Sequence, residues 1–324
     1  QQQQIIKKDL TAKPNVSYNT GAMVKTFPVY RESPQKLYVP RFYGIHTFGP
    51  CTNYHISEGT DIQLQFIGTL RDFQHQIINS YITSIQQNDC ALLDIPCGFG
   101  KTVCALYIIS QLQKKTLVIV HKEFLLQQWK ERIQEFLPGA RVGTIQGPVV
   151  DIEDKDIVIG MLQSISQREY DLKIFKDFGF TIIDECHHIG AETFSKSLYK
   201  INSYYMLGLS ATPKRKDGLS KVFEWYLGPM VYQMKRKGDD DNMLVKTIEF
   251  NSTVKPYSKE ELTFQGKICM AKMINNVCGY EKRTRFIIEI IKSLLPEDRR
   301  ILILSDRRGH LTRMFELLQE QKID

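Results

Sequence analysis

The chain has 324 residues, with 43 Lys and Arg against 36 Asp and Glu, which gives a formal net charge of +7. Hydrophobic residues make up 42% and charged residues 24%, values of an ordinary globular protein that exclude a mainly disordered chain. No apolar run approaches the roughly 18 residues that a membrane-crossing helix needs, so we expect no membrane partner. A chain of this length predicts about two domains.

The seven cysteines contain no CxxC pair and show no even spacing. This distribution argues against a zinc module and against the disulfide framework of a secreted protein. We therefore expect free thiols in a reducing compartment and an intracellular, cytoplasmic or nuclear, location. The basic excess is compatible with a nucleic-acid partner but does not identify one.

Residues 1–65 predict a small β-rich N-terminal module. Short runs of aromatic and β-branched residues, such as 23–30 and 36–43, are separated by Pro and Gly. Basic residues alternate with the aromatic ones, a pattern that suits nucleic-acid contact by charge and stacking. The alternative is that the aromatic side chains form the core of the module, and both interpretations stay open.

Residues 66–228 alternate between short apolar runs and segments of helical spacing. The helices are expected over residues 101–112 and from Leu125 to Phe136, where Pro138 and Gly139 follow. The expected strands are residues 91–95, 117–120, 157–159, 180–183 and 205–209. Strands that are apolar throughout are buried on both faces, so they predict a parallel sheet covered by helices in an α/β nucleotide-binding domain.

Residues 229–324 predict a linker and the beginning of a second α/β layer. A helical segment over 268–295, a strand over 301–304 and a helix over 310–321 make one β–α step. The charged, Gly-containing segments 214–222 and 235–242 are predicted to be solvated loops.

The segment Pro-Cys-Gly-Phe-Gly-Lys-Thr at residues 96–102 lies between a predicted strand and a predicted helix. Gly98 and Gly100 would let backbone N–H groups approach phosphates, and the helix N-terminus adds a positive dipole. Lys101 would reach the β- and γ-phosphates, and Thr102 would ligate Mg²⁺. The strict pattern has a glycine six positions before the lysine, where this chain has isoleucine, so a tight turn in a core is the alternative.

Two further polar segments end predicted strands. The carboxylates of Asp184 and Glu185 follow strand 180–183, at the edge where parallel sheets bind ligands. Asp184 would hold Mg²⁺ through water, and Glu185 would orient or deprotonate the attacking water. A helix N-cap with surface acids is the alternative. The Ser-Ala-Thr tripeptide at residues 210–212 ends the next strand, where its hydroxyl groups would couple the nucleotide site to a neighbouring surface.

The order of phosphate loop, acidic strand end with His187 and Ser-Ala-Thr resembles superfamily 2 helicases of the DExH type. The segments Leu-Gly-Leu-Ser-Ala-Thr-Pro at 207–213 and Ile-Leu-Ile-Leu-Ser-Asp-Arg at 301–307 look closest to XPB-like translocases. The run that begins at Asp94 is similar to helicases of large DNA viruses, of the poxvirus transcript-release type. The resemblance covers residues 70–324 and implies a RecA-like domain followed by an incomplete second one.

The resemblance also implies roles for single residues. Gln74, within residues 70–74, occupies the place of the glutamine that reads the adenine of ATP. His187, Ser210 and Thr212 occupy places that couple nucleotide hydrolysis to nucleic-acid contact. Contacts to the nucleic-acid backbone are implied for His121, Lys122, Gln163, Ser164, Ser305 and Arg307.

These matches together imply an ATP- and Mg²⁺-dependent nucleic-acid helicase or translocase. The expected partner is DNA in transcription, repair or recombination, with RNA not excluded, and transcription or virion machinery and the virion itself are further expectations. The family's late Gln-x-x-Gly-Arg-x-x-Arg segment does not occur in this sequence, so we expect a truncated motor or one that needs another polypeptide for turnover.

Other classes of protein stay open as alternatives. One is a nucleotide-gated nucleic-acid-binding module without independent turnover, and another is the motor subunit of a restriction-type nuclease. A P-loop kinase or transport ATPase would explain the phosphate loop but not Gln74, His187 and residues 210–212 together.

Overall fold

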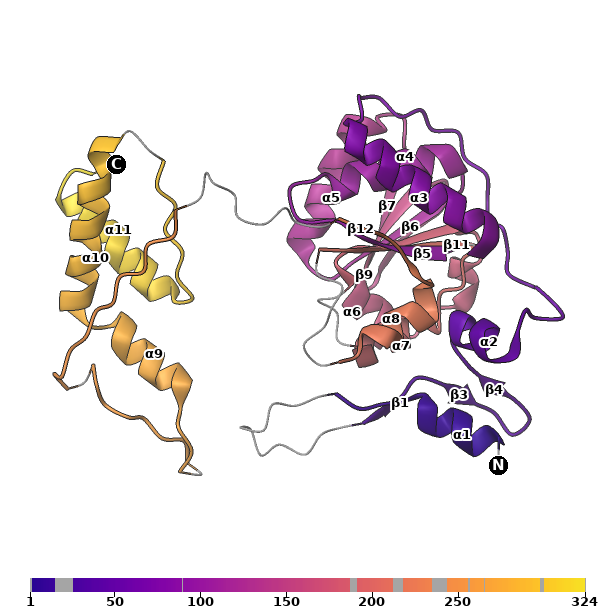
Figure 1. Ribbon diagram of the computed structural model, residues 1–324. Helices are drawn as coiled ribbons and strands as arrows, with labels where there is room; N and C mark the ends of the chain where they lie inside the picture. Colours follow the sequence, from indigo (N-terminus) through magenta and orange to yellow (C-terminus); the bar gives the residue numbers. More distant parts are fainter. Residues whose placement is uncertain are drawn as a thin grey trace. The chain divides into compact units, whose positions relative to one another are not determined.

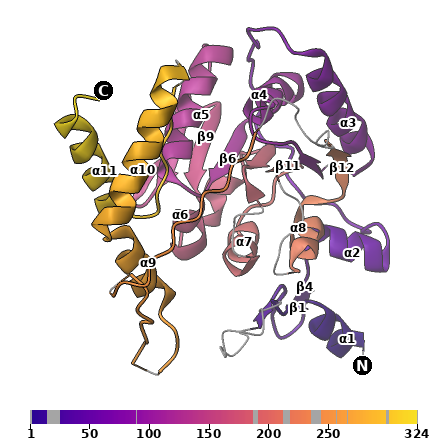
Figure 2. The same cartoon turned by 60° about the vertical axis from the view of Figure 1, so that its left-hand side comes forward.

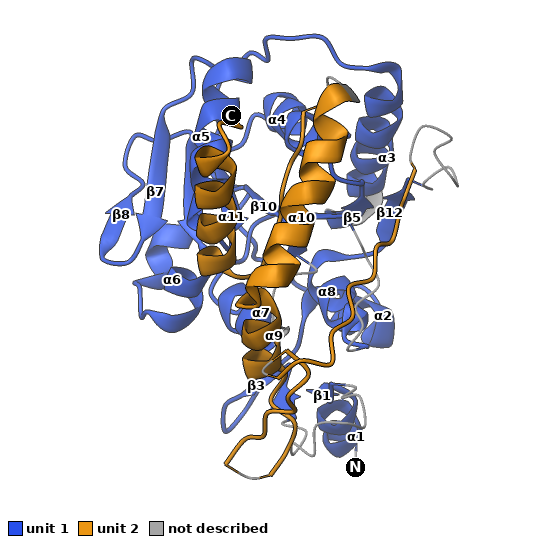
Figure 3. Cartoon of the chain, turned by 90° about the vertical axis from the view of Figure 1, so that its left-hand side faces the viewer, with its two compact units in different colours: residues 1–237 blue, residues 238–324 orange. Residues whose placement is uncertain are grey.

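The computed structural model describes residues 2–14, 26–88, 90–186, 191–211, 218–234, 244–255, 257–264, 266–297 and 300–323 (Figure 1). The chain divides into two compact units, residues 1–237 and 238–324, which Figure 3 shows in different colours. The division into three parts with boundaries after residues 65 and 228 stays a prediction. In the described part of the chain, no helix is long and apolar enough to cross a bilayer.

An eight-stranded sheet forms the centre of unit 1. Its spatial order is β12-β5-β11-β10-β6-β9-β7-β8, and all neighbours are parallel except the antiparallel pair β7 and β8. The predicted parallel sheet is therefore confirmed. Its strands are β5 (Cys90–Asp94), β6 (Thr116–Val120), β7 (Val142–Gln146), β8 (Val149–Asp151), β9 (Ile157–Met161), β10 (Phe180–Ile183), β11 (Tyr205–Ser210) and β12 (Met230–Gln233).

Helices cover both faces of this sheet (Figures 1 and 2). Successive side chains of a strand point to opposite faces, so Ala91 and Leu93 of β5 join one apolar cluster while Cys90 and Leu92 join the other. The first cluster is completed by α3 (Asp72–Asn88), α4 (Lys101–Leu112) and α5 (Glu123–Phe136). The second is completed by α6 (Leu162–Gln167), the 3₁₀ turn Leu172–Phe175, α7 (Ala191–Leu198) and α8 (Ser220–Leu227).

The N-terminal segment of unit 1 contains very short strands and two helices. The strands are only two residues long, and the second β-prone run turns into helix α2 directly after Pro40. Phe27 and Val29 are buried in the same apolar cluster as Leu92 of β5. The buried aromatic residues therefore contribute to a core shared with the rest of unit 1. The elements are α1 (Gln2–Asp9), the pair β1 (Thr11–Ala12) and β2 (Phe27–Pro28), the pair β3 (Arg31–Glu32) and β4 (Leu37–Tyr38), and α2 (Arg41–Phe48).

Arg41 connects the N-terminal segment to the sheet by hydrogen bonds. Its guanidinium donates to the Sγ atom of Cys90 at 3.0 Å, to the carbonyl oxygen of Tyr204 at 3.1 Å and to that of Ser203 at 2.8 Å. These groups lie where β5 and β11 begin, so the segment is anchored at the amino edge of the sheet. The carboxyl edge, where parallel sheets bind ligands, is the opposite one.

We expect Arg41→Ala to lower the free energy of unfolding by about 2 kcal/mol, because it leaves two partly buried carbonyl groups without a charged donor. Urea unfolding followed by circular dichroism would measure the change. Arg132→Ala on α5, which removes an exposed ion pair with Glu135, is the matched control and should stay within about 0.5 kcal/mol. Equal losses in the two variants would contradict the anchoring role.

Unit 2 is built from α9 (Met270–Cys278), α10 (Glu281–Leu294), the 3₁₀ turn Leu295–Glu297 and α11 (Arg308–Glu320). The helix predicted over 268–295 is thus interrupted at Gly279 and Tyr280. The strand predicted over 301–304 is wrong as a paired strand, because the described residues offer it no ladder partner and Leu302 and Leu304 are 81% and 82% exposed. The core of unit 2 is small, with Ile288, Ile291, Met314 and Leu317 buried.

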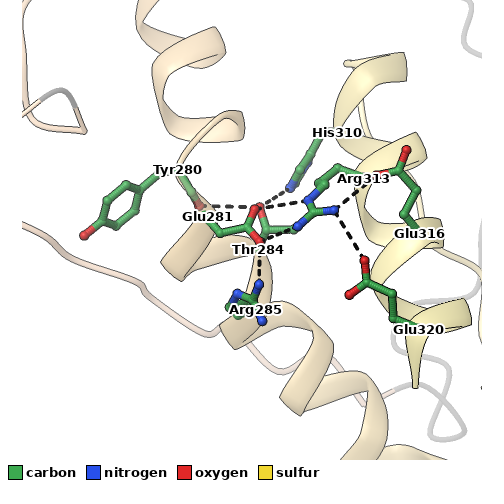
Figure 4. A network of polar contacts seen from close by, with 8 residues as sticks. All are labelled: Tyr280, Glu281, Thr284, Arg285, His310, Arg313, Glu316 and Glu320. Atoms are coloured by element: carbon green, nitrogen blue, oxygen red, sulfur yellow. Dashed lines mark hydrogen bonds and ion pairs between the residues drawn. The ribbon is translucent and has the colours of Figure 1, made fainter.

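A polar network joins α10 and α11 (Figure 4). Arg313 donates two hydrogen bonds to the Glu281 carboxylate, at 3.2 and 2.7 Å, and thereby lowers the pKa of Glu281. His310 lies beside the network, with Nε2 3.3 Å from the hydroxyl of Thr284. Burial lowers the pKa of His310, and the positive charge of Arg283 adds to this effect.

We expect the helix pair of unit 2 to lose stability in mild acid. A histidine with a lowered folded-state pKa contributes stability that is present above its unfolded pKa of about 6.5 and is lost as the pH falls through the folded value. Hydrogen exchange of the α10 and α11 amides at pH 5 and 7.5 would measure this loss. His310→Gln should remove it and His46→Gln on α2 should not; an unchanged pH dependence in His310→Gln would refute the assignment.

Candidate functional site

The carboxyl edge of the sheet brings together five of the segments that the sequence singles out. Because their strands run parallel, the segments that follow them emerge on the same side. Along the edge lie the loop 96–102 after β5, Ser210 at the end of β11, Asp184 after β10, His121 after β6 and Gln163 after β9. The functional roles of these residues remain predictions.

The loop at residues 96–102 depends on two glycines in the left-handed region. Gly98 has φ +85° and Gly100 has φ +81°, a conformation that costs other L-residues free energy. Gly100 directly precedes α4, so Lys101 opens the helix. A Cβ atom at position 100 would collide with the Gln74 amide, whereas nothing lies within 4 Å of one at position 98.

Gln74, the predicted adenine-reading residue, lies against this loop. It is buried in the first turn of α3. Its Oε1 atom accepts from the backbone N–H of Arg71 at 2.9 Å, and its Nε2 atom donates to the carbonyl oxygen of Phe99 at 3.3 Å. The amide thus holds the loop, and these two bonds use one of its two N–H donors and one of its two lone pairs.

Lys101 and Glu185 form an ion pair across the site. Their side chains are only 10% and 16% exposed, so the pair is shielded from solvent. Glu185 has φ +50°, which is uncommon for a residue with a side chain and stores strain in the turn after β10. The base predicted for water activation is therefore neutralised by the lysine predicted for phosphate binding.

Asp184 is buried behind this pair. The indole N–H of Trp129 on α5 donates to its Oδ2 atom at 2.8 Å, and its own backbone N–H donates to the carbonyl oxygen of Ile119 at 3.0 Å. Burial raises the pKa of Asp184, an effect that Trp129 and Lys101 oppose. The helical spacing of apolar residues predicts that Trp129 is buried in the core but does not predict this hydrogen bond. The available signal was chemical, since a buried indole N–H needs an acceptor.

These residues fit a nucleoside triphosphate with Mg²⁺. The oxygen atoms of Thr102 and Asp184 are ligands of the kind that Mg²⁺ prefers, and Lys101 with the α4 N-terminus suits phosphate oxygens. Among the described residues, no group of three or more His, Cys, Asp and Glu side chains could hold a metal ion. His187 and Thr212 lie outside the described residues.

Of the four predicted backbone-contacting residues of unit 1, Gln163 and His121 bind each other directly. Gln163 donates through Nε2 to the carbonyl oxygen of His121 at 2.8 Å, which links the ends of β9 and β6. The hydroxyl of Ser164 accepts from the backbone N–H of Gly147 at 2.8 Å. Lys122 is the exposed N-cap residue of α5.

The two predicted contacts of unit 2 lie at the start of α11. The Ser305 hydroxyl accepts from the backbone N–H of Arg307 at 3.3 Å. The Arg307 Nε atom donates to Oδ1 of Asn275 at 2.6 Å. Arg307 and Arg308 line a cavity of about 360 Å³ together with the ion pair of Arg313 and Glu281.

We expect Gly100→Ala to destabilise the chain more than Gly98→Ala. Both variants pay about 1–2 kcal/mol for a left-handed alanine, but only position 100 adds a collision with Gln74, worth about a further 1–3 kcal/mol. Urea unfolding of both variants would measure the difference. Equal free energies of unfolding would show that the Gln74 side chain moves away from the added methyl group without lowering stability.

Known proteins resemble this chain in both sequence and structure. The family described as "Type III restriction enzyme, res subunit" matches residues 67–215. A putative ATP-dependent RNA helicase of Acanthamoeba polyphaga mimivirus is 34% identical over 98% of this chain and 62% of its own length. A putative helicase of Invertebrate iridescent virus 3 is 31% identical over 75% of this chain and 78% of its own length.

Two further proteins resemble the chain, one in the sequence of about half of it and the other in fold. A DNA 3′–5′ translocase of the XPB type from Sulfurisphaera tokodaii is 34% identical over 51% of this chain and 35% of its own length. The crystal structure of the UvsW helicase from bacteriophage T4 is similar in fold, with a TM-score of 0.50, 15% identity and coverage of 71% of this chain and 92% of that one. The chain spans less than two thirds of the mimivirus and archaeal relatives.

Proposed function

The chain belongs to the superfamily 2 helicases of the group found in large DNA viruses, and we propose that it carries the ATP-binding domain of a DNA translocase. The observation that supports this most directly is the contact between Lys101 and Glu185. It joins the phosphate loop after β5 to the acidic end of β10, two strands away in the sheet. A phosphate-binding group and a candidate base thus meet in one shielded place.

Each residue of the site has a part in the proposed reaction. When bound, ATP with Mg²⁺ supplies a γ-phosphoryl group that can be transferred to water. Lys101 and the backbone N–H groups of the loop 96–102 would hold the phosphate oxygens, while Thr102 would provide an oxygen ligand for the cation and Asp184 would hold it through water. Glu185, once separated from Lys101, orients the attacking water and accepts its proton. Gln74 recognises the base.

DNA is proposed as the substrate because the motor region is similar to that of a protein named as a DNA translocase. His121, Lys122, Gln163 and Ser164 would contact the phosphate backbone, so sequence preference should be slight. We propose transcription or virion machinery as the setting, on the resemblance to viral helicases.

We expect Glu185→Gln to retain ATP binding and to abolish DNA-stimulated hydrolysis, because the amide keeps the size of the side chain but cannot accept the proton. Lys101→Ala should weaken nucleotide binding itself, since the phosphate charge loses its partner. Equilibrium binding of a fluorescent ATP analogue and phosphate release with duplex DNA, single-stranded DNA or RNA would separate the two variants.

The same measurements decide between the alternatives. Loss of binding in Glu185→Gln would make Glu185 structural, and unchanged turnover in Lys101→Ala would remove the phosphate-loop assignment. Nucleotide binding without stimulated hydrolysis in the native 324-residue chain would favour a nucleotide-gated binding module. Hydrolysis that is stimulated by RNA and not by DNA would show that the substrate is RNA.

A further inference from the structure

We propose that Trp129 is a positioning residue for the cation-binding carboxylate of Asp184, an inference that rests on the proposed function. The indole N–H of Trp129 donates to Oδ2 of Asp184 at 2.8 Å. The two residues are 55 positions apart in the sequence and come from α5 and from the turn after β10. A hydrogen bond to one carboxylate oxygen fixes the plane of the group and therefore the place of Oδ1.

Burial makes this bond effective. Trp129 is 1% exposed and Asp184 is 5% exposed, so water does not compete for either partner. The indole nitrogen is a donor only, and it would be left unsatisfied if Asp184 turned away. The ring itself is packed in the apolar cluster that holds Leu126 and Ile133 of the same helix. The donor is thus held rigidly by packing.

Trp129 is the side-chain donor to the Asp184 carboxylate, and the backbone N–H of Glu185 is a further donor to it. The backbone N–H of Asp184 donates to the carbonyl oxygen of Ile119, which fixes the main chain but not the carboxylate. Lys101 acts on Asp184 through its charge, but its ammonium group is paired with Glu185. Partners that orient a ligand in this way typically change metal affinity about 10–100-fold when removed.

The test compares the two tryptophans of the chain. Trp129→Phe removes the donor, and Trp225→Phe makes the same change on α8, where the ring packs edge-on against Tyr43 at 5.6 Å. Affinity for a fluorescent ATP analogue is measured with Mg²⁺ and with EDTA. We expect Trp129→Phe to lower the Mg²⁺-dependent gain in affinity about 10–100-fold and to leave the affinity in EDTA unchanged, while Trp225→Phe alters neither.

A second substitution removes the donor without changing the size of the ring. In the Trp225→Phe background, biosynthetic incorporation of benzothienylalanine replaces the indole N–H with sulfur at position 129 alone. The same loss of the Mg²⁺-dependent gain supports the proposal even if Trp129→Phe folds poorly. A gain equal to that of the parent overturns it. If the native chain shows no Mg²⁺-dependent binding, the proposed function fails, and this inference with it.

Discussion

The parallel direction of the central strands is the constraint on which the rest of unit 1 depends. A parallel pair needs a crossover, and the crossovers here place helices on both faces of the sheet. The inner strands are consequently mostly apolar on both sides, and the polar residue Thr181 inside β10 is buried with Ser203 as its hydrogen-bond partner. The carboxyl ends of the parallel strands then meet at one edge, where residues from β5, β10 and β11 lie next to one another.

The sequence predicts the inner strands of unit 1 well and its edges poorly. Strands β5, β6, β9, β10 and β11 are recognisable because nearly all of their residues are apolar or small, as burial on two faces requires, with Asp94 at the end of β5 as an exception. Strands β7, β8 and β12 were missed, because they are partly exposed and lack that signature. Residues 301–304 carry the same apolar signature without a ladder, since composition does not report which strand is available for pairing.

The site shows the same division between local and distant information. The phosphate loop and the acidic strand end are local patterns, so their places at the sheet edge followed from the order of elements. The ion pair of Lys101 with Glu185 joins residues 84 positions apart, and the bond of Trp129 to Asp184 spans 55. Neither spacing has a sequence signature. The sequence therefore predicts the composition of the site but not its internal contacts.

Because Lys101 and Glu185 are paired, a ligand that binds either side chain must replace its present counter-ion. Each side chain already has a counter-ion, so a ligand that brings only negative charge would have to displace Glu185 and leave that carboxylate uncompensated beside Asp184. A ligand that brings an anion together with a divalent cation replaces both partners at once. An anion bound together with a divalent cation would provide a counter-charge for both side chains, whereas a bare anion would provide one for Lys101 alone.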